Sequence, residues 1–308
     1  MRTAFINWLC SRAATDSAIV LLTADLGYSV VETFAEAFPD RFINVGVAEQ
    51  NMVGIAAGLA SEGYKPYTYS IGIFPTFRCA EQLRNDIDYH ELPVVTSTVG
   101  SGLAYGSLGY THHMIQDLAL MRSLPNTLIG TPIDPNEVIS ILDWHHQNPC
   151  PLYLRMHKSG DPVVHEKIPD VVPGKWIRVA GGNGSKIHLD KIAIVVAGSM
   201  GPKVNEALSV LDKSIDLFSL PLWGQSVRAT QEEWFTKYEH VITVEDHLLD
   251  GGFGSWMMEN VAIFGANTKI YPIALDSSSV GKVAKEDVLI SPLIIKLNSV
   301  VSNVLSVL

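Results

Sequence analysis

Short apolar runs rich in β-branched residues alternate with longer amphipathic stretches along the whole chain. This alternation is typical of a parallel sheet covered by helices on both faces. In the first half of the chain it predicts strands at residues 19–22, 43–45, 67–69, 94–96, 128–129 and 152–154. In the second half it predicts strands at 192–196, 214–220, 241–245 and 269–275, followed by a C-terminal helix from about Ser291. We therefore expect an α/β protein with two doubly wound, mostly parallel units.

A change in composition separates the two predicted units. Pro169, Pro173 and Gly174 precede a glycine-rich run at 181–185, and such residues form the turns of a domain connection. We predict a first domain over residues 1–165, a linker with a hairpin over 166–190, and a smaller second domain over 191–308.

Composition narrows the class of protein. The chain has 308 residues, 47% of them hydrophobic, and a formal net charge of −10 at pH 7, as expected for a soluble globular protein. It lacks the basic runs that bind nucleic acid or anionic lipid, and its apolar stretch at 18–24 is too short to span a bilayer. Its three cysteines are scattered, without the spacing typical of a metal site or a disulfide framework. They are Cys10, Cys79 and Cys150. We expect a cytoplasmic protein without a nucleic-acid or membrane partner.

The strand expected at 43–45 leads into a helix that begins near Glu49. Small residues, Gly54, Ala57 and Gly58, recur along this helix and allow another element to approach closely. The dipole and the free N–H groups at a helix N-terminus favour a carboxylate. Glu49 therefore fits a simple helix cap, and spacing alone leaves that interpretation as open as a functional one.

The segment after the third predicted strand continues into a helix. Its apolar residues Ile71, Phe74 and Phe77 are spaced by three, which would place them on one helix face. Such a face usually packs in a core, and it is also compatible with the wall of a pocket.

A glycine-rich loop further along the chain carries His112 and His113. Adjacent histidines without a third ligand at a suitable spacing are weak candidates for a metal site. Imidazoles that titrate near neutral pH are better placed to handle protons.

Together these segments resemble the transketolase family, in the runs FINVGVAEQNMVGIAAGLA, YSIGIFPTFRCAEQLRND and GSLGYTHHMIQDLALMRSLPN. The resemblance implies that Glu49 hydrogen-bonds the pyrimidine of thiamine diphosphate. It also implies that Phe74 stacks on this ring in a trio with Ile71 and Phe77, and that His112 faces the thiazolium and the substrate hydroxyls. Ile71 departs from the usual aromatic residue, so we expect one wall of the pocket to be reshaped.

The resemblance extends to positions that are weak indicators alone. Asp25 and Leu26 match a loop that supports the bent form of the cofactor. Substrate contacts are implied at Arg2, Ser29, His112, His113, Arg155 and Lys158. Lys158 replaces a usual arginine, and a lysine binds phosphate as a point charge rather than as a bidentate fork. From the residues alone, ordinary solvated charges and a capping hydroxyl explain these positions equally well.

Two departures from the family concern the substrate. Gly100 stands where transketolases commonly have a histidine, and Leu108 stands where many have an acidic residue. Both changes make the pocket less polar, and loss of a carboxylate weakens discrimination for a sugar hydroxyl. We expect an unusual donor or acceptor sugar.

The chain lacks the Gly-Asp-Gly motif through which the family holds Mg²⁺ and the diphosphate. The runs at 159–162 and 249–252 do not match it. The resemblance covers only the pyrimidine-binding and C-terminal domains of a full-length transketolase, and so implies the C-terminal subunit of a split enzyme. A separate N-terminal subunit is expected to bring the diphosphate-binding domain and most contacts to Mg²⁺, in an α2β2 assembly.

The reaction implied by this resemblance moves a two-carbon glycolaldehyde unit from a ketose phosphate to an aldose acceptor. Two alternatives stay open, which are the β subunit of a 2-oxoacid dehydrogenase and a transketolase-like scaffold without catalysis. Deoxyxylulose-phosphate synthase is a weaker match because it normally carries both halves in one chain.

Overall fold

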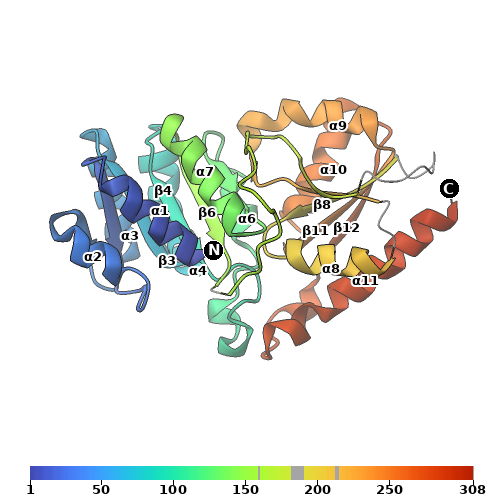
Figure 1. Ribbon diagram of the computed structural model, residues 1–308, viewed down its shortest axis with the longest axis horizontal. Coiled ribbons are helices and arrows are strands. Elements are labelled where there is room, and N and C mark those ends of the chain that lie inside the picture. Colours follow the sequence, from blue (N-terminus) through green and yellow to red (C-terminus); the bar gives the residue numbers. More distant parts are fainter. Residues whose placement is uncertain (159, 182–190, 212–214, 308) are drawn as a thin grey trace.

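Figure 1 shows two helix-covered sheets side by side, the first in blue to green and the second in yellow to red. This computed structural model describes residues 1–158, 160–181, 191–211 and 215–307. From position 182 on, the expected glycine-rich run lies outside the described residues, as does Ser214 at the start of an expected strand. The predicted α/β architecture of two mostly parallel sheets is confirmed.

The first sheet has the strand order β10-β5-β6-β4-β3-β1-β2. Its strands are β1 (Ile19–Thr23), β2 (Phe42–Asn44), β3 (Lys65–Ile71), β4 (Val95–Val99), β5 (Leu128–Gly130), β6 (Leu152–Met156) and β10 (Leu222–Trp223). Neighbouring strands are parallel except for β10 and β5. Strands β1, β4 and β6 are buried along their whole length because helices cover both faces of the sheet.

Helices of the first half of the chain cover both faces of this sheet. They are α1 (Arg2–Ala13), α2 (Glu32–Ala37), η1 (Pro39–Arg41), α3 (Glu49–Ser61), α4 (Ile73–Arg78), α5 (Ala80–Gln82), η2 (Leu83–Asp88), η3 (Gly106–Leu108), η4 (Tyr110–His112), α6 (Asp117–Met121) and α7 (Pro135–Gln147). Residues of α1 and α7 share one buried cluster, whereas α3 belongs to a second cluster on the other face. Helix α7 begins with Pro135 after Asp134, whose carboxylate accepts the N–H of Glu137 at 2.9 Å.

The second sheet has the strand order β12-β11-β8-β9-β7. Its strands are β7 (Ile177–Ala180), β8 (Ile192–Ala197), β9 (Asp216–Ser219), β11 (His240–Leu248) and β12 (Lys269–Leu275). Strand β7 lies among residues expected to form the linker, and it pairs antiparallel with β9 at one edge. The division into domains at 165 and 190 stays a prediction.

Helices also sandwich the second sheet, with α9 and α10 on one side and α8 and α11 on the other (Figure 1). The helices are α8 (Gly201–Leu211), η6 (Gln225–Gln231), α9 (Glu232–Lys237), α10 (Phe253–Phe264), η7 (Ser277–Ser279) and α11 (Glu286–Val307). Helix α11 starts earlier than the expected Ser291. Glu286 and Asp287 occupy its first turn, where the helix dipole favours carboxylates.

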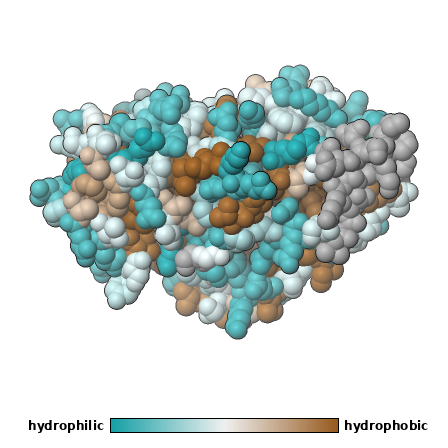
Figure 2. Space-filling model, in the orientation of Figure 1, coloured by the Kyte–Doolittle hydropathy of each residue, from teal (hydrophilic) through white to brown (hydrophobic). Residues whose placement is uncertain are grey.

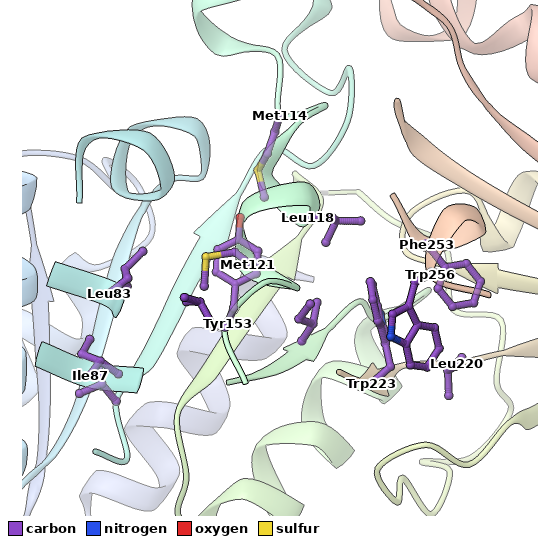
Figure 3. Close-up of a cluster of buried hydrophobic side chains, with 14 of the residues drawn as sticks. Leu83, Ile87, Met114, Leu118, Met121, Tyr153, Leu220, Trp223, Phe253 and Trp256 are labelled. Carbon is purple, nitrogen blue, oxygen red and sulfur yellow. The ribbon is translucent and has the colours of Figure 1, made fainter. Parts of the chain in front are cut away.

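One hydrophobic core joins the two sheets. Strand β10 follows β9 in the chain but adds to the edge of the first sheet, next to β5. Figure 3 shows Trp223 of β10 packed against Phe253 and Trp256 of α10, with ring centroids 5.4 Å and 5.0 Å away. The same buried cluster continues to Met121 of the first half. The two halves therefore pack against each other through a shared core rather than being joined only by a linker.

The segment between β6 and β7 crosses from one sheet to the other over the surface (Figure 1). Figure 2 shows hydrophobic surface in the middle of this face. Val163, Ile168 and Val172 of the segment are exposed, whereas Val171 and Trp176 are buried. The buried pair anchors the crossing segment to the core.

Helix α11 is long and apolar enough over Glu286–Ser306 to cross a membrane by length and composition alone. Its buried side chains join the core of the second sheet, and they are Ile290, Leu293, Leu297, Val301 and Val304. A core helix of a soluble protein passes the same test. The absence of a membrane partner stays a prediction.

Candidate active site

Glu49 is the first residue of α3 and follows the turn that leaves β2. This confirms the predicted place of Glu49 at a helix N-terminus. The residue is only 4% exposed, and its Oε1 accepts a hydrogen bond from Arg78 Nη1 at 2.7 Å. A buried carboxylate loses hydration, so the guanidinium compensates its charge.

Helix α4 carries both Arg78 and the aromatic residue Phe74. The Arg78 guanidinium carbon lies 4.4 Å from the centroid of the Phe74 ring. The His112 ring meets the edge of Phe74, with centroids 5.4 Å apart and planes at 71°. Glu49, Phe74, Arg78 and His112, here named the edge cluster, thus converge from three separate segments of the chain.

Arg78 is a residue of this cluster that was not predicted from the sequence. A signal was present, because Arg78 follows Phe74 by four positions and residues with this spacing are neighbours on a helix. The side chain of Arg78 is 48% exposed, so water reaches one side of the ion pair with Glu49.

Ile71 does not lie on the helix that carries Phe74 and Phe77. Strand β3 extends to Ile71, because this residue pairs with Val99 of β4, and α4 begins only at Ile73. Phe77 is 51% exposed, which excludes it from the core. The expected common helix face is therefore wrong for Ile71, whereas Phe74 and Phe77 are three positions apart on α4.

The loop after β1 is tied to the turn that precedes Glu49. Asn44 Oδ1 accepts the backbone N–H groups of Asp25 and Gly46, each at 3.0 Å. Leu26 is partly buried, and its carbonyl accepts the Thr23 hydroxyl at 2.5 Å. These bonds hold the residues expected to support the cofactor next to the N-terminus of α3.

The expected substrate residues Ser29 and Lys158 lie at accessible positions. Ser29 is exposed at φ 61°, and its backbone N–H donates to Glu32 Oε1 at 2.7 Å. Lys158 Nζ donates to the Ala104 carbonyl at 3.1 Å and lies 2.9 Å from Glu286 Oε2. Both residues keep enough exposure to meet a ligand.

Arg2 and His113 have different surroundings. Arg2 begins α1, and its charge lies close enough to Tyr69 to oppose the rise in pKa that burial causes in that phenol. His113 is fully buried, with Nε2 3.3 Å from the Gly106 carbonyl oxygen. It therefore faces its own loop rather than an open site.

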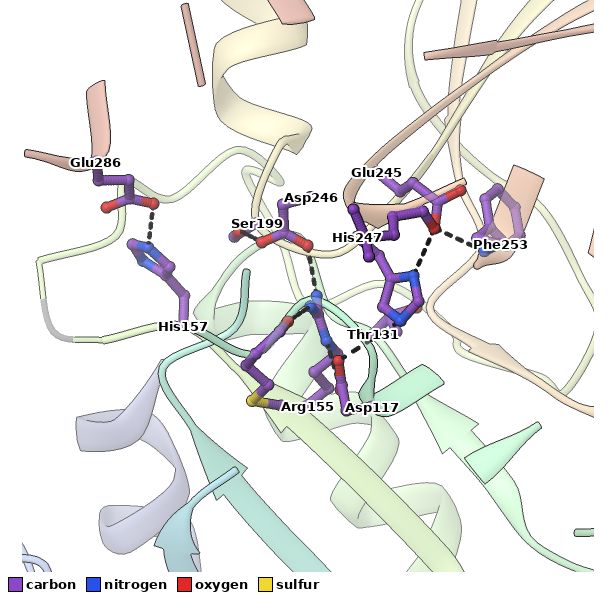
Figure 4. Close-up of polar contacts among 12 residues, drawn as sticks. Asp117, Thr131, Arg155, His157, Ser199, Glu245, Asp246, His247, Phe253 and Glu286 are labelled. Atoms are coloured by element: carbon purple, nitrogen blue, oxygen red, sulfur yellow. Dashed lines mark hydrogen bonds and ion pairs between the residues drawn. The ribbon is translucent and has the colours of Figure 1, made fainter. Parts of the chain in front are cut away.

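Arg155 has partners that differ from the sequence-based expectation. Its guanidinium is buried and donates to Asp117 Oδ2 at 2.8 Å, Asp246 Oδ1 at 2.5 Å and the Met114 carbonyl at 2.6 Å (Figure 4). Burial raises the pKa of Asp246, but the charge and hydrogen bonds of Arg155 lower it overall. Arg155, Asp117 and Asp246, here named the junction network, link the two halves of the chain. The expected contact of Arg155 with the substrate phosphate is therefore wrong, because its guanidinium is buried and has a structural role.

His157 lies beside the junction network and between two carboxylates. Its Nδ1 is 2.5 Å from Asp161 Oδ1. Its Nε2 is 2.7 Å from Glu286 Oε1, a contact drawn in Figure 4. Burial would lower the pKa of His157, but these hydrogen bonds and charges raise it to about 9. The imidazole is therefore protonated at neutral pH and joins the segment after β6 to α11.

The edge cluster lies at the end of the first sheet where the carboxyl ends of its parallel strands meet. Open α/β sheets bind ligands at the carboxyl ends of their strands. Large apolar side chains on loops and helices that follow β1 to β4 are exposed here, namely Tyr28, Val47, Phe77, Leu108 and Tyr110. Among the described residues, no group of three or more His, Cys, Asp or Glu is arranged to hold a metal ion.

The fold thus defines an α/β protein with mostly parallel sheets, the class that binds ligands at the carboxyl ends of its strands. Residues 1–161 match the family described as the transketolase pyrimidine binding domain. The chain belongs to the transketolase family, and the resemblance predicted from its sequence is confirmed.

The chain is also similar to two individual transketolase proteins and to one solved structure. A subunit of apulose-4-phosphate transketolase from Actinobacillus succinogenes is 35% identical over 241 residues, which cover 77% of this chain and 75% of that protein. A protein of Methanocaldococcus jannaschii described as a transketolase C-terminal section is 31% identical over 276 residues, 88% of this chain and 84% of that protein. A solved split gene transketolase, described as an inactive beta4 tetramer, is 29% identical with a TM-score of 0.78 over 95% of this chain and 92% of that one.

Proposed function

We propose that this chain is the C-terminal subunit of a thiamine-diphosphate-dependent transketolase, which moves a glycolaldehyde unit from a ketose phosphate to an aldose. The observation that carries the proposal is the buried Glu49 carboxylate at the start of α3, whose partner Arg78 also lies over the Phe74 ring. A buried carboxylate acceptor in one cluster with an aromatic ring suits an aminopyrimidine.

Each residue of the cluster has its own role in this proposal. Glu49 would accept a hydrogen bond from a pyrimidine nitrogen, and Phe74 would pack against the ring. When bound, thiamine diphosphate supplies the nucleophilic carbon of the reaction. His112, whose Nδ1 lies 3.0 Å from Thr111 Oγ1, would hold or move a proton at the substrate hydroxyls.

An N-terminal subunit would complete the site. The chain has no Gly-Asp-Gly motif for Mg²⁺ and the diphosphate. The exposed Tyr28, Val47 and Leu108 form apolar surface on the same edge as Glu49, and such surface is typical of a protein interface. We propose that the partner covers this edge, supplies the Mg²⁺ site and assembles with this chain as α2β2.

Arg2, Ser29 and Lys158 would bind the substrate phosphate. Lys158 is held near the site by the Ala104 carbonyl, and its charge is shared with Glu286. A phosphate that competes with Glu286 for this ammonium would be bound by charge rather than by bidentate geometry.

Calorimetric titration of thiamine diphosphate with Mg²⁺ tests the proposal. The titrant is added to this chain alone and to its mixture with a candidate N-terminal subunit. We expect binding only in the mixture, lost in Glu49→Gln and kept in Glu62→Gln, which alters an exposed glutamate at the end of the same helix. Tight binding to the chain alone would contradict the shared site, and no binding to either would favour a scaffold.

Turnover of the mixture separates the candidate reactions. We expect transfer of a two-carbon unit from a ketose phosphate to an aldose in a screen of sugar pairs. Consumption of pyruvate with a lipoyl acceptor would instead favour a 2-oxoacid dehydrogenase.

A further inference from the structure

Tyr105 fills the space beside Gly100. A Cβ atom at position 100 would lie 2.3 Å from Tyr105 Cε2 and 2.5 Å from Cδ2, closer than real side-chain contacts allow. Gly100 also has φ +93°, a conformation that side chains rarely adopt. The tyrosine ring and the glycine are therefore required together, and a larger residue at position 100 would displace the ring.

Cationic groups surround this tyrosine. Burial raises the pKa of the Tyr105 phenol, whereas the charges of Arg2 and Lys158 oppose the rise. Lys158 also donates to the carbonyl of Ala104, the residue before Tyr105, at 3.1 Å. Tyr105 thus lies in the same neighbourhood as the two cations that would bind the substrate phosphate.

The phenol hydroxyl of Tyr105 is free to bind a ligand. The ring is only partly buried. Within the part of the chain that the structure describes, no hydrogen bond involves this hydroxyl, whereas the buried Tyr153 hydroxyl donates to Asp117 at 2.9 Å. A hydroxyl can both donate and accept a hydrogen bond, so this one has that capacity left for a ligand.

We propose that Tyr105 is a specificity-determining residue, whose hydroxyl binds a hydroxyl group of a phosphorylated sugar held by Arg2 and Lys158. This inference rests on the proposed function. The phenol supplies the polar group that a side chain at position 100 cannot supply. A neutral hydrogen bond contributes about 0.5–1.5 kcal/mol, or about two- to tenfold in affinity.

The first test is calorimetric titration of ribose 5-phosphate and xylulose 5-phosphate into the full chain, with inorganic phosphate as a second probe. We expect Tyr105→Phe to weaken binding of at least one sugar phosphate about two- to tenfold and to leave inorganic phosphate unchanged. The control Tyr89→Phe alters an exposed tyrosine on another loop and should bind as the unaltered chain does. Equal binding by both variants, or no binding by the unaltered chain, overturns the inference.

The second test uses the complex with the N-terminal subunit. We expect Tyr105→Phe to raise KM for the sugar phosphate more than it lowers kcat, with thiamine diphosphate affinity unchanged. An unaltered KM overturns the inference. If the complex with the unaltered chain is inactive with every sugar pair, the proposed function is refuted. The inference on Tyr105 is then still decided by the first test, because binding is measured there without turnover.

Discussion

The edge cluster and the junction network each pair an arginine with carboxylates, but in opposite surroundings. Arg78 is 48% exposed and meets Glu49 at the open edge of the first sheet. Arg155 is 0% exposed and meets Asp117 and Asp246 between the two halves of the chain. Water reaches the guanidinium of Arg78, whereas it does not reach the guanidinium of Arg155. Exposure rather than residue type therefore separates an arginine beside a ligand site from one that holds the fold.

Removal of Arg155 should have the largest effect. In Arg155→Met, the carboxylates of Asp117 and Asp246 stay buried without their cation. Breaking a buried ion pair in this way costs about 3–5 kcal/mol. Urea denaturation should show this loss in the free energy of unfolding, and a loss below that from Arg78→Gln would contradict the comparison.

Glu49→Gln should come next, with its effect on activity rather than on stability. The amide keeps the shape of the side chain but loses the negative charge that would polarise the pyrimidine. Groups that act in proton transfer contribute about 10²–10⁴-fold, and we expect a loss of kcat in that range in the complex. Near-normal turnover would refute the assignment of Glu49, whereas Glu62→Gln serves as the control.

His157 should make stability depend on pH. Its pKa is raised to about 9 in the folded chain, above the usual 6.5. The stabilisation is therefore fully present below pH 6.5 and is lost as the pH rises through 9. The slope is at most about 1.4 kcal/mol per pH unit.

Denaturation curves at several pH values check this window. The difference in unfolding free energy between the unaltered chain and His157→Gln should shrink from pH 6.5 to pH 9. A constant difference would mean that the imidazole does not change its charge between Asp161 and Glu286.

Arg78→Gln should have the smallest effect on stability. Glu49 is only 4% exposed but Arg78 is 48% exposed, so the variant leaves a buried acceptor without its partner beside solvent, at a cost of about 1–3 kcal/mol. Urea denaturation should place this variant within that range. A cost equal to that of Arg155→Met would remove the distinction between the two regions.

Local pattern predicted much of the fold and part of the site. The strands at β1 to β6 and the helix that begins at Glu49 were predicted because alternating apolar runs and small-residue spacing are encoded within a few neighbouring positions. The alignment of Phe74 and His112 with Glu49 came from the family resemblance, and the structure brings the Phe74 and His112 rings together. Ile71 was misplaced because strand pairing with Val99 extends β3 beyond the local apolar pattern.

The sequence by itself determined the α/β class, the family and the place of Glu49 at a helix start. Only the tertiary structure decided that β10 joins the first sheet, that Arg155 is buried in the junction network, and that Tyr105 fills the space beside Gly100. Arg155 and Asp246, for example, are 91 positions apart. Hydrophobic periodicity reports which face of one element is buried, but it does not report which distant element covers that face.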